Sequence, residues 1–172
     1  RDVAEPIAFV RRYFTKEAGV VTNPSSKFTL TGRCAEADNT MRLVRFARNG
    51  KNDIAILNFS THPDVIGGTK WSADWPGFAR RFLEEDIAGT SCLFFTGCQG
   101  DSNHYDYFLP REKRLHGKRY EHSAYMGRMV ADAAVGVWNE MTPAADDSIF
   151  AENRIIYNRT NTEGVEKYDE CV

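Results

Sequence analysis

Two stretches of sequence decide the fold and the place of a site: NFSTHPDVIGGTKWSAD at residues 58–74 and TGCQGDSNH at residues 96–104. Each one continues a short apolar run, and such runs bounded by turn residues predict buried strands. The two loops hold polar side chains suited to chemistry, namely His62, Asp64, Asp74, Asp101, Asn103 and His104. Ligands bind beyond the carboxyl ends of strands in open α/β sheets, so we expect these side chains to form one site.

Outward from these loops, the apolar patterns predict an α/β fold: a layered domain with a mixed β-sheet flanked by helices. Strands are expected at residues 6–14, 20–21, 41–48, 53–59, 90–96 and 148–157. Asn49-Gly50 predicts a hairpin that pairs residues 41–48 with residues 53–59 in antiparallel fashion. The polar stretch at residues 29–40, which contains Gly32, is expected to be an irregular loop.

Two helices are expected, at residues 76–87 and 120–141. Asp74 can cap the first helix, Pro76 suits its first turn, and Gly89 lies just past its end. The second helix has a wide apolar face and should stop at Thr142-Pro143. A further helix at residues 162–171 lacks a stop signal. We therefore expect residues 1–172 to be a single domain and a fragment of a larger one.

Composition narrows the class of protein. A length of 172 residues suits one domain, and 42% hydrophobic residues is ordinary for a globular chain. A net charge of -2 argues against nucleic acid as a partner. The basic cluster at residues 111–119, REKRLHGKR, is interpreted as a solvated loop, with an anion site as the alternative. No apolar run approaches the ~20 residues of a membrane-spanning helix.

The four cysteines, at positions 34, 92, 98 and 171, are scattered along the chain. Their spacing is not that of a structural zinc site, and a chain of this length does not depend on disulfides. Buried thiols favour a reducing compartment, so we expect a cytoplasmic protein, with secretion as the alternative.

Three blocks carry a resemblance to a known family: LNFSTHPDVIGG at residues 57–68, WSADWPGFARRFLEED at residues 71–86 and CLFFTGCQGDSNH at residues 92–104. In this order they resemble the catalytic domain of the neutral/alkaline, non-lysosomal ceramidase family, as a divergent bacterial-type member. Upstream, Val10-Arg11-Arg12-Tyr13 and Thr22-Asn23-Pro24 are similar to that family's N-R-S…N-P segment.

The resemblance implies roles for three residues. The family's T-H histidine is a zinc ligand, which implies that role for His62; the other ligands, an upstream H-x-H histidine and a downstream Glu and Tyr, have no counterpart here. From spacing alone, a histidine beside a strand end is more often structural. Arg11 matches an active-site arginine, with Arg12 as the alternative and a solvent-facing arginine as the plain interpretation. Asp74 either caps its helix or orients the zinc-binding histidine.

One departure from the family changes the expected chemistry. Asn103 stands where the family has its nucleophilic serine, and His104 replaces the proline. A carboxamide is not a nucleophile, and Ser102, one position earlier, would point the opposite way on an extended segment. The chemistry that remains is attack by zinc-activated water, with Asn103 stabilising the oxyanion and Asp101 and His104 as candidate proton carriers.

The leading hypothesis is therefore a ceramidase-like, zinc-dependent hydrolase of an amide or ester bond in a small-molecule or lipid substrate, which need not be ceramide. The alternative is a non-catalytic protein of the same fold that binds a ligand or partner. A weaker alternative is an unrelated α/β domain whose Gly-Asp loop binds an anion. An unpaired sheet edge also predicts self-association.

Overall fold

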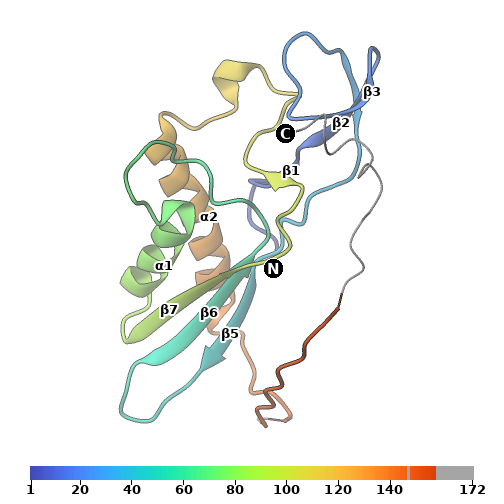
Figure 1. Ribbon diagram of the computed structural model, residues 1–172. Coiled ribbons are helices and arrows are strands. Elements are labelled where there is room, and N and C mark those ends of the chain that lie inside the picture. The colour runs from blue at the N-terminus through green and yellow to red at the C-terminus, as the bar shows by residue number, and fades with distance from the viewer. Residues whose placement is uncertain (147, 158–172) are drawn as a thin grey trace. The chain divides into compact units, whose positions relative to one another are not determined.

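The computed structural model describes residues 1–146 and 148–157 (Figure 1). The chain divides into two units, Arg1–Met141 and Thr142–Val172, and all helices and strands of the described residues lie in the first. The strands are β1 (Phe9–Val10), β2 (Arg12–Thr15), β3 (Gly19–Thr22), β4 (Leu30–Arg33), β5 (Arg42–Phe46), β6 (Asp53–Phe59), β7 (Thr90–Thr96) and β8 (Ser102–Asn103). The helices are α1 (Asp74–Asp86), the 3₁₀ turn η1 (Arg111–Lys113) and α2 (Arg119–Trp138).

The largest sheet has the order β5-β6-β7. β5 and β6 are antiparallel across the Asn49-Gly50 turn, where Gly50 has φ +67°. β6 and β7 are parallel and are joined through α1, so β6-α1-β7 is a βαβ unit. The predicted hairpin and the α/β class with a mixed sheet are both confirmed.

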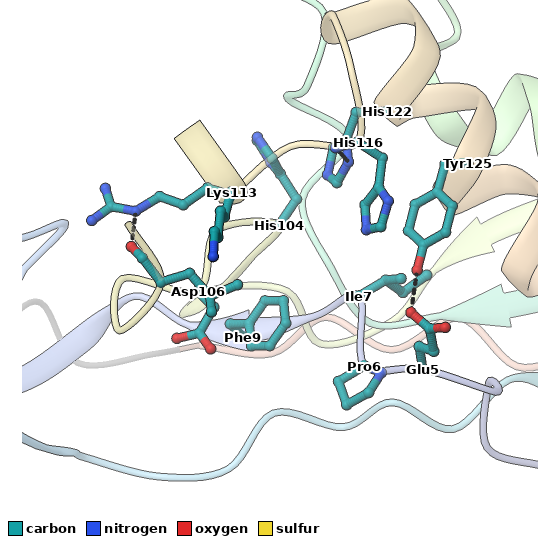
Figure 2. Close-up of a pocket in the computed structure, with 12 residues that line it drawn as sticks. Glu5, Pro6, Ile7, Phe9, His104, Asp106, Lys113, His116, His122 and Tyr125 are labelled. Atoms are coloured by element: carbon teal, nitrogen blue, oxygen red, sulfur yellow. Dashed lines mark hydrogen bonds between the residues drawn. The ribbon is translucent and has the colours of Figure 1, made fainter. Parts of the chain in front are cut away.

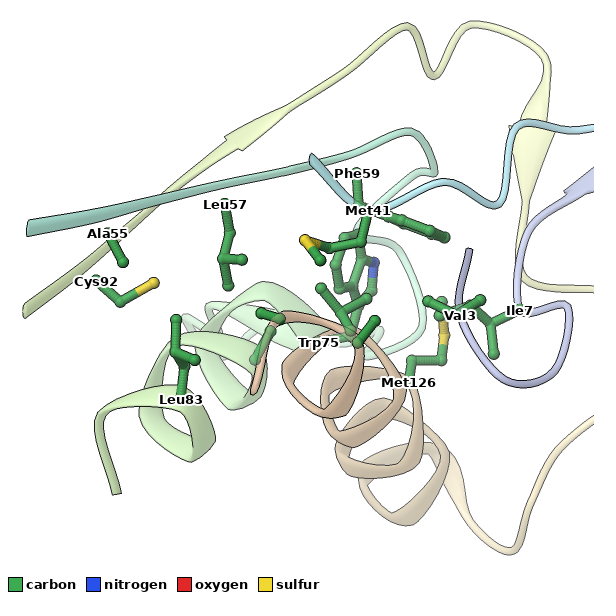
Figure 3. Close-up of a cluster of buried hydrophobic side chains, with 14 of the residues drawn as sticks. Val3, Ile7, Met41, Ala55, Leu57, Phe59, Trp75, Leu83, Cys92 and Met126 are labelled. Carbon is green, nitrogen blue, oxygen red and sulfur yellow. The ribbon is translucent and has the colours of Figure 1, made fainter. Parts of the chain in front are cut away.

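The core lies between this sheet and the two helices, which cover the same face of the sheet (Figure 3). The alternate residues Ala55, Leu57 and Phe59 of β6 are fully buried toward the helices. The Trp75 ring packs edge-on against Phe59 and Phe94, at centroid distances of 5.7 and 4.9 Å. Trp75 therefore anchors the start of α1 to the sheet.

The opposite face of the sheet is apolar but exposed. By register, Val44, Phe46, Leu93 and Phe95 share this face, and they are 41–57% exposed. Parallel strand pairs are usually covered on both faces. The expected self-association stays a prediction, and this face supplies apolar surface for it.

The N-terminal strands differ from the prediction. The expected strand at residues 6–14 is split at Arg11, whose N–H donates to Asp101 O at 2.8 Å while its carbonyl accepts from Asn23 N at 2.7 Å. Before Arg11 the chain pairs with β8, as strand β1. After Arg11 it pairs with β3 and β4, as strand β2. The loop expected at residues 29–40 contains β4, because its backbone pairs with β2 although its side-chain pattern is weak.

Both expected helices are present, but Asp74 is not the N-cap. Ala73 holds that position without a side-chain cap bond, and Asp74 is the first helical residue, at φ +51°. Its carboxylate still accepts the N–H of Trp75 at 2.6 Å. The predicted cap is therefore wrong by one position, although Asp74 does satisfy a backbone donor of the first turn.

The strand expected at residues 148–157 is wrong. These residues pair with no strand among those that the structure describes, and the apolar members Ile149, Phe150, Ile155, Ile156 and Tyr157 are 77–91% exposed. Alternation alone does not make a strand when no neighbouring strand accepts its backbone hydrogen bonds. The helix expected at residues 162–171 lies outside the described residues.

Candidate functional site

The two loops singled out from the sequence meet in the structure. β1 pairs with β8, which places Phe9 opposite Asn103 and Val10 opposite Ser102. The N–H of His62 donates to Ser102 O at 3.3 Å. Three distant segments, around residues 9–12, 62–64 and 101–104, therefore converge beyond the carboxyl ends of β6 and β7.

Arg11 rather than Arg12 reaches the first loop. Arg11 Nη1 lies 3.4 Å from His62 Nε2, and Arg11 Nε is buried without a hydrogen-bond partner. Arg12 points to the surface and forms an exposed ion pair with Asp101 at 3.6 Å. A partly buried, incompletely bonded guanidinium is suited to hold a carbonyl oxygen or a carboxylate through paired donors.

His104 forms an acid–imidazole pair with Asp64. His104 Nδ1 lies 3.0 Å from Asp64 Oδ1, and the imidazole is 3% exposed while the carboxylate is 50% exposed. Burial opposes ionisation of Asp64, but the hydrogen bond from His104 and the charges of His104 and His62 outweigh it and lower the pKa of Asp64. An ionised Asp64 accepts the proton on Nδ1, which leaves the lone pair of His104 on Nε2.

His104 Nε2 is buried and has no hydrogen-bond partner in the protein. The ring of Tyr105 packs on the imidazole, with centroids 4.1 Å apart. An unsatisfied buried nitrogen costs folding free energy, so its retention at the site points to use in binding or proton transfer.

Asp74 acts on the backbone of the first loop and not on the His62 ring. Its carboxylate accepts the Ile66 N–H at 2.8 Å and the Ser123 hydroxyl at 2.9 Å. The next residue, Trp75, donates its indole N–H to the carbonyl of His62 at 3.1 Å. Asp74 and Trp75 therefore fix the path of the loop, and the expected direct orientation of the His62 ring is not what the carboxylate does.

The second loop places its polar residues in different environments. Asn103 Oδ1 accepts the N–H of His104 at 2.6 Å and the side chain is 6% exposed. Ser102 is buried with an unpartnered hydroxyl. Asp101 lies at the surface with Arg12. Among the side-chain hydrogen bonds and ion pairs of the described residues, His104 is the one of these that reaches the first loop, through Asp64.

A cavity of about 350 Å³ adjoins His104, and sequence analysis missed it (Figure 2). His116, His122 and Tyr125 form one side, across from Glu5, Pro6 and Phe9 of the N-terminal segment. The His116 and Tyr125 rings stack at 3.7 Å, and the centroids of His104 and His122 are 5.6 Å apart. The available signal was the histidines themselves: three of the four in the chain line the cavity, and the fourth, His62, lies in the loop that contacts Ser102.

Burial shifts the pKa values of two side chains that line the cavity, His122 and Tyr125. It lowers the pKa of His122 to about 4, with smaller contributions from His104 and His116. His122 Nδ1 accepts the backbone N–H of His116 at 3.1 Å, which suits a neutral ring. Burial and the hydrogen bond to Glu5, 2.9 Å long, raise the pKa of Tyr125 to about 12. The imidazole of His122 and the phenol of Tyr125 are therefore both neutral near neutral pH.

The side-chain donors near His62 do not fit zinc. Catalytic zinc sites take three protein ligands, and no group of three His, Cys, Asp or Glu side chains in residues 1–146 and 148–157 could hold a metal ion. The nitrogen His62 Nε2 also faces the Arg11 guanidinium. The described residues do not form a zinc site by themselves.

Comparison of the chain with models of protein families, with curated proteins and with solved structures gave no match. The ceramidase resemblance therefore rests on the sequence motifs alone and stays a prediction.

Proposed function

We propose that the chain carries the acid–base site of a hydrolase that cleaves an amide or ester bond in a small-molecule or lipid substrate. The observation that supports this most is the Asp64–His104 pair, in which a buried imidazole is held through Nδ1 and keeps Nε2 free beside a cavity. The sequence resemblance to ceramidases points to the same bond class.

In this proposal His104 is the general base. Its Nε2 takes a proton from a water molecule as the water oxygen attacks the carbonyl carbon, and the carbonyl oxygen becomes an oxyanion. Asp64 holds the imidazole in the required tautomer and stabilises the imidazolium. The proton then passes from Nε2 to the leaving nitrogen or oxygen as the bond breaks, which gives a carboxylic acid and an amine or alcohol. The acid then loses its remaining proton to solvent and becomes a carboxylate.

Arg11 is the candidate for stabilising the charge that develops on the carbonyl oxygen. Its guanidinium is always charged, and its Nε has no partner in the protein. A donor of this kind, placed before the reaction starts, contributes ~10²–10³ in rate. Asn103 has its carboxamide oxygen committed to the His104 N–H, which leaves only its amide NH₂ for the oxyanion role.

Zinc remains a separate part of the proposal. His62 would supply one ligand, with the other ligands outside the described residues, and the metal would supply Lewis-acid activation of water or carbonyl when bound. The proposed roles of His104, Asp64 and Arg11 do not depend on zinc.

The test is hydrolysis of p-nitrophenyl esters and p-nitroanilides of short and long acyl chains by the full-length gene product. His104→Asn keeps an N–H that can donate to Asp64 but removes the basic nitrogen, so hydrolysis should fall by ~10²–10⁴. A folded wild-type protein that binds these substrates without hydrolysing any of them would favour the non-catalytic binding protein instead.

A further inference from the structure

A surface beside the cavity combines exposed cations with exposed apolar side chains. We call it the basic-aromatic face and define it as Lys70, Trp71, Phe108, Leu109, Arg111, Lys113, Lys118, Arg119 and Tyr120, all of them exposed. Within residues 111–119 there are five Lys or Arg and one Glu, whereas the whole chain has a net charge of -2. Positive charge is therefore concentrated on this face.

The cations of this face are not found in ion pairs among the described residues. None of the ion pairs found among the described residues includes Arg111, Lys113, Lys118 or Arg119. Arg114, between them, behaves differently, because it donates to Leu109 O at 2.9 Å and stacks over the Tyr107 ring at 4.7 Å. The contrast separates one structural arginine, Arg114, from two arginines and two lysines whose charges have no ion-pair partner among the described residues.

Trp71 supplies a large apolar group to the same face. It is fully exposed, whereas the other two tryptophans, Trp75 and Trp138, are 0% and 7% exposed. The loop that carries Trp71 lies against Arg119, because the side chain of Arg119 occupies the space beside Gly67. Figure 1 shows this loop, the start of α2 and η1 at the same end of the first unit.

Phe108, Leu109 and Tyr120 extend the apolar part, with exposures of 45%, 41% and 57%. Tryptophan and tyrosine are favoured at the boundary between lipid and water, and Lys and Arg are attracted to anionic headgroups. Peripheral membrane binding requires both terms, a buried apolar area and an electrostatic attraction. The basic-aromatic face provides both, from three separate segments of the chain.

We propose that the basic-aromatic face docks the protein onto the surface of an anionic lipid bilayer. No helix among the described residues has the length and hydropathy to cross a bilayer, so the proposed attachment is peripheral. Basic residues enter the headgroup layer, and Trp71 inserts its indole among the headgroups.

Docking would also bring the cavity to the bilayer. Leu109 and Lys113 belong to the face and also line the cavity beside His104. A substrate that enters from this side would be a lipid with a polar amide or ester linkage near its headgroup. This statement about the substrate rests on the proposed function, whereas docking itself does not.

Docking is measured by sedimentation of the protein with phosphatidylcholine vesicles that contain or lack phosphatidylserine. We expect binding only when phosphatidylserine is present, with a decrease as salt rises. Bromine-labelled lipid should quench the fluorescence of Trp71 alone, because the other two tryptophans are buried. Equal binding to both kinds of vesicle, or binding without quenching, would overturn the proposal.

The matched variants are Arg111→Gln/Lys118→Gln and the control Arg48→Gln/Lys51→Gln, which removes the same charge from the hairpin at the other end of the unit (Figure 1). Each neutralised cation of the face should lower the partition coefficient about fivefold, or roughly thirtyfold for the pair. The control should bind as wild type does. Equal losses in the two variants, or binding to a nucleic acid but not to vesicles, would contradict lipid docking.

One further variant separates the two proposals. His104→Asn should dock as wild type does while losing hydrolysis. If the wild-type protein docks but does not hydrolyse the substrates, the hydrolase proposal is wrong and the docking proposal stands. If it hydrolyses them but does not dock, the docking proposal is wrong and the hydrolase proposal stands.

Discussion

His104 Nδ1 lies 3.0 Å from Asp64 Oδ1, although the two residues are 40 positions apart in the sequence. The contact joins the loop that follows β6 to the residue directly after β8. It gives the imidazole one fixed orientation and leaves its second nitrogen without a partner in the protein. The proposed chemistry depends on this relationship.

Asp64→Asn tests the relationship. The carboxamide can donate its N–H to His104 Nδ1, which would move the ring proton to Nε2 and remove the base. We expect kcat to fall by about a hundredfold or more with little change in KM. The ¹⁵N shifts of the His104 imidazole should report the change of tautomer together with the loss of kcat. Asp38→Asn, at a carboxylate paired with Arg42 on the surface, is the control.

His122 predicts how stability depends on pH. Its pKa is lowered from 6.5 to about 4 by burial, so between these values the unfolded chain binds more protons than the folded one. The free energy of unfolding should therefore fall as pH drops from 6.5 toward 4, by at most on the order of 3 kcal/mol. Urea denaturation across this range measures it.

The matched variant is His122→Asn, whose carboxamide oxygen can still accept the His116 N–H. In this variant the free energy of unfolding should depend less on pH between pH 6.5 and 4 than it does in wild type. An unchanged slope in this variant would show that other groups cause the acid destabilisation.

Trp75 connects the core to the site. Its ring is fully buried and its indole N–H holds the His62 carbonyl at 3.1 Å. Trp75→Phe removes this hydrogen bond and should lower the free energy of unfolding by about 1 to 3 kcal/mol, and Trp75→Ala by about 3 to 5 kcal/mol. Trp71→Phe, at an exposed indole, should stay within about 0.5 kcal/mol of wild type in urea denaturation.

Zinc content decides the role of His62. Elemental analysis of the full-length gene product should find about one zinc per chain, lost in His62→Ala. A folded wild-type protein without metal would leave His62 as the partner of Arg11. The roles of His104 and Asp64 would survive that outcome.

The sequence predicted best where local patterns are strong. Asn49-Gly50 identified the hairpin, and the apolar runs identified β6 and β7 with the helix between them. The turn and the apolar runs are each encoded by a few consecutive residues, so they can be recognised without knowing the rest of the fold. β4 was missed because its strand character comes from backbone pairing with β2, which its sequence LTGR does not reveal.

The site could be predicted in part for the same reason. The meeting of the two loops followed from strand ends, but the pairing of Asp64 with His104 depends on side-chain directions set by the whole fold. His116 and His122 were missed because the cavity forms between α2 and the N-terminal segment, which are far apart in sequence.

The most direct test of the proposed hydrolase is the hydrolysis rate of an N-acyl p-nitroanilide by the full-length gene product, with His104→Ala beside wild type and with or without imidazole in solution. We predict turnover by wild type, a loss of about a hundredfold or more in the folded variant, and partial recovery when imidazole enters the vacated space. A folded His104→Ala variant that is as active as wild type would contradict the account.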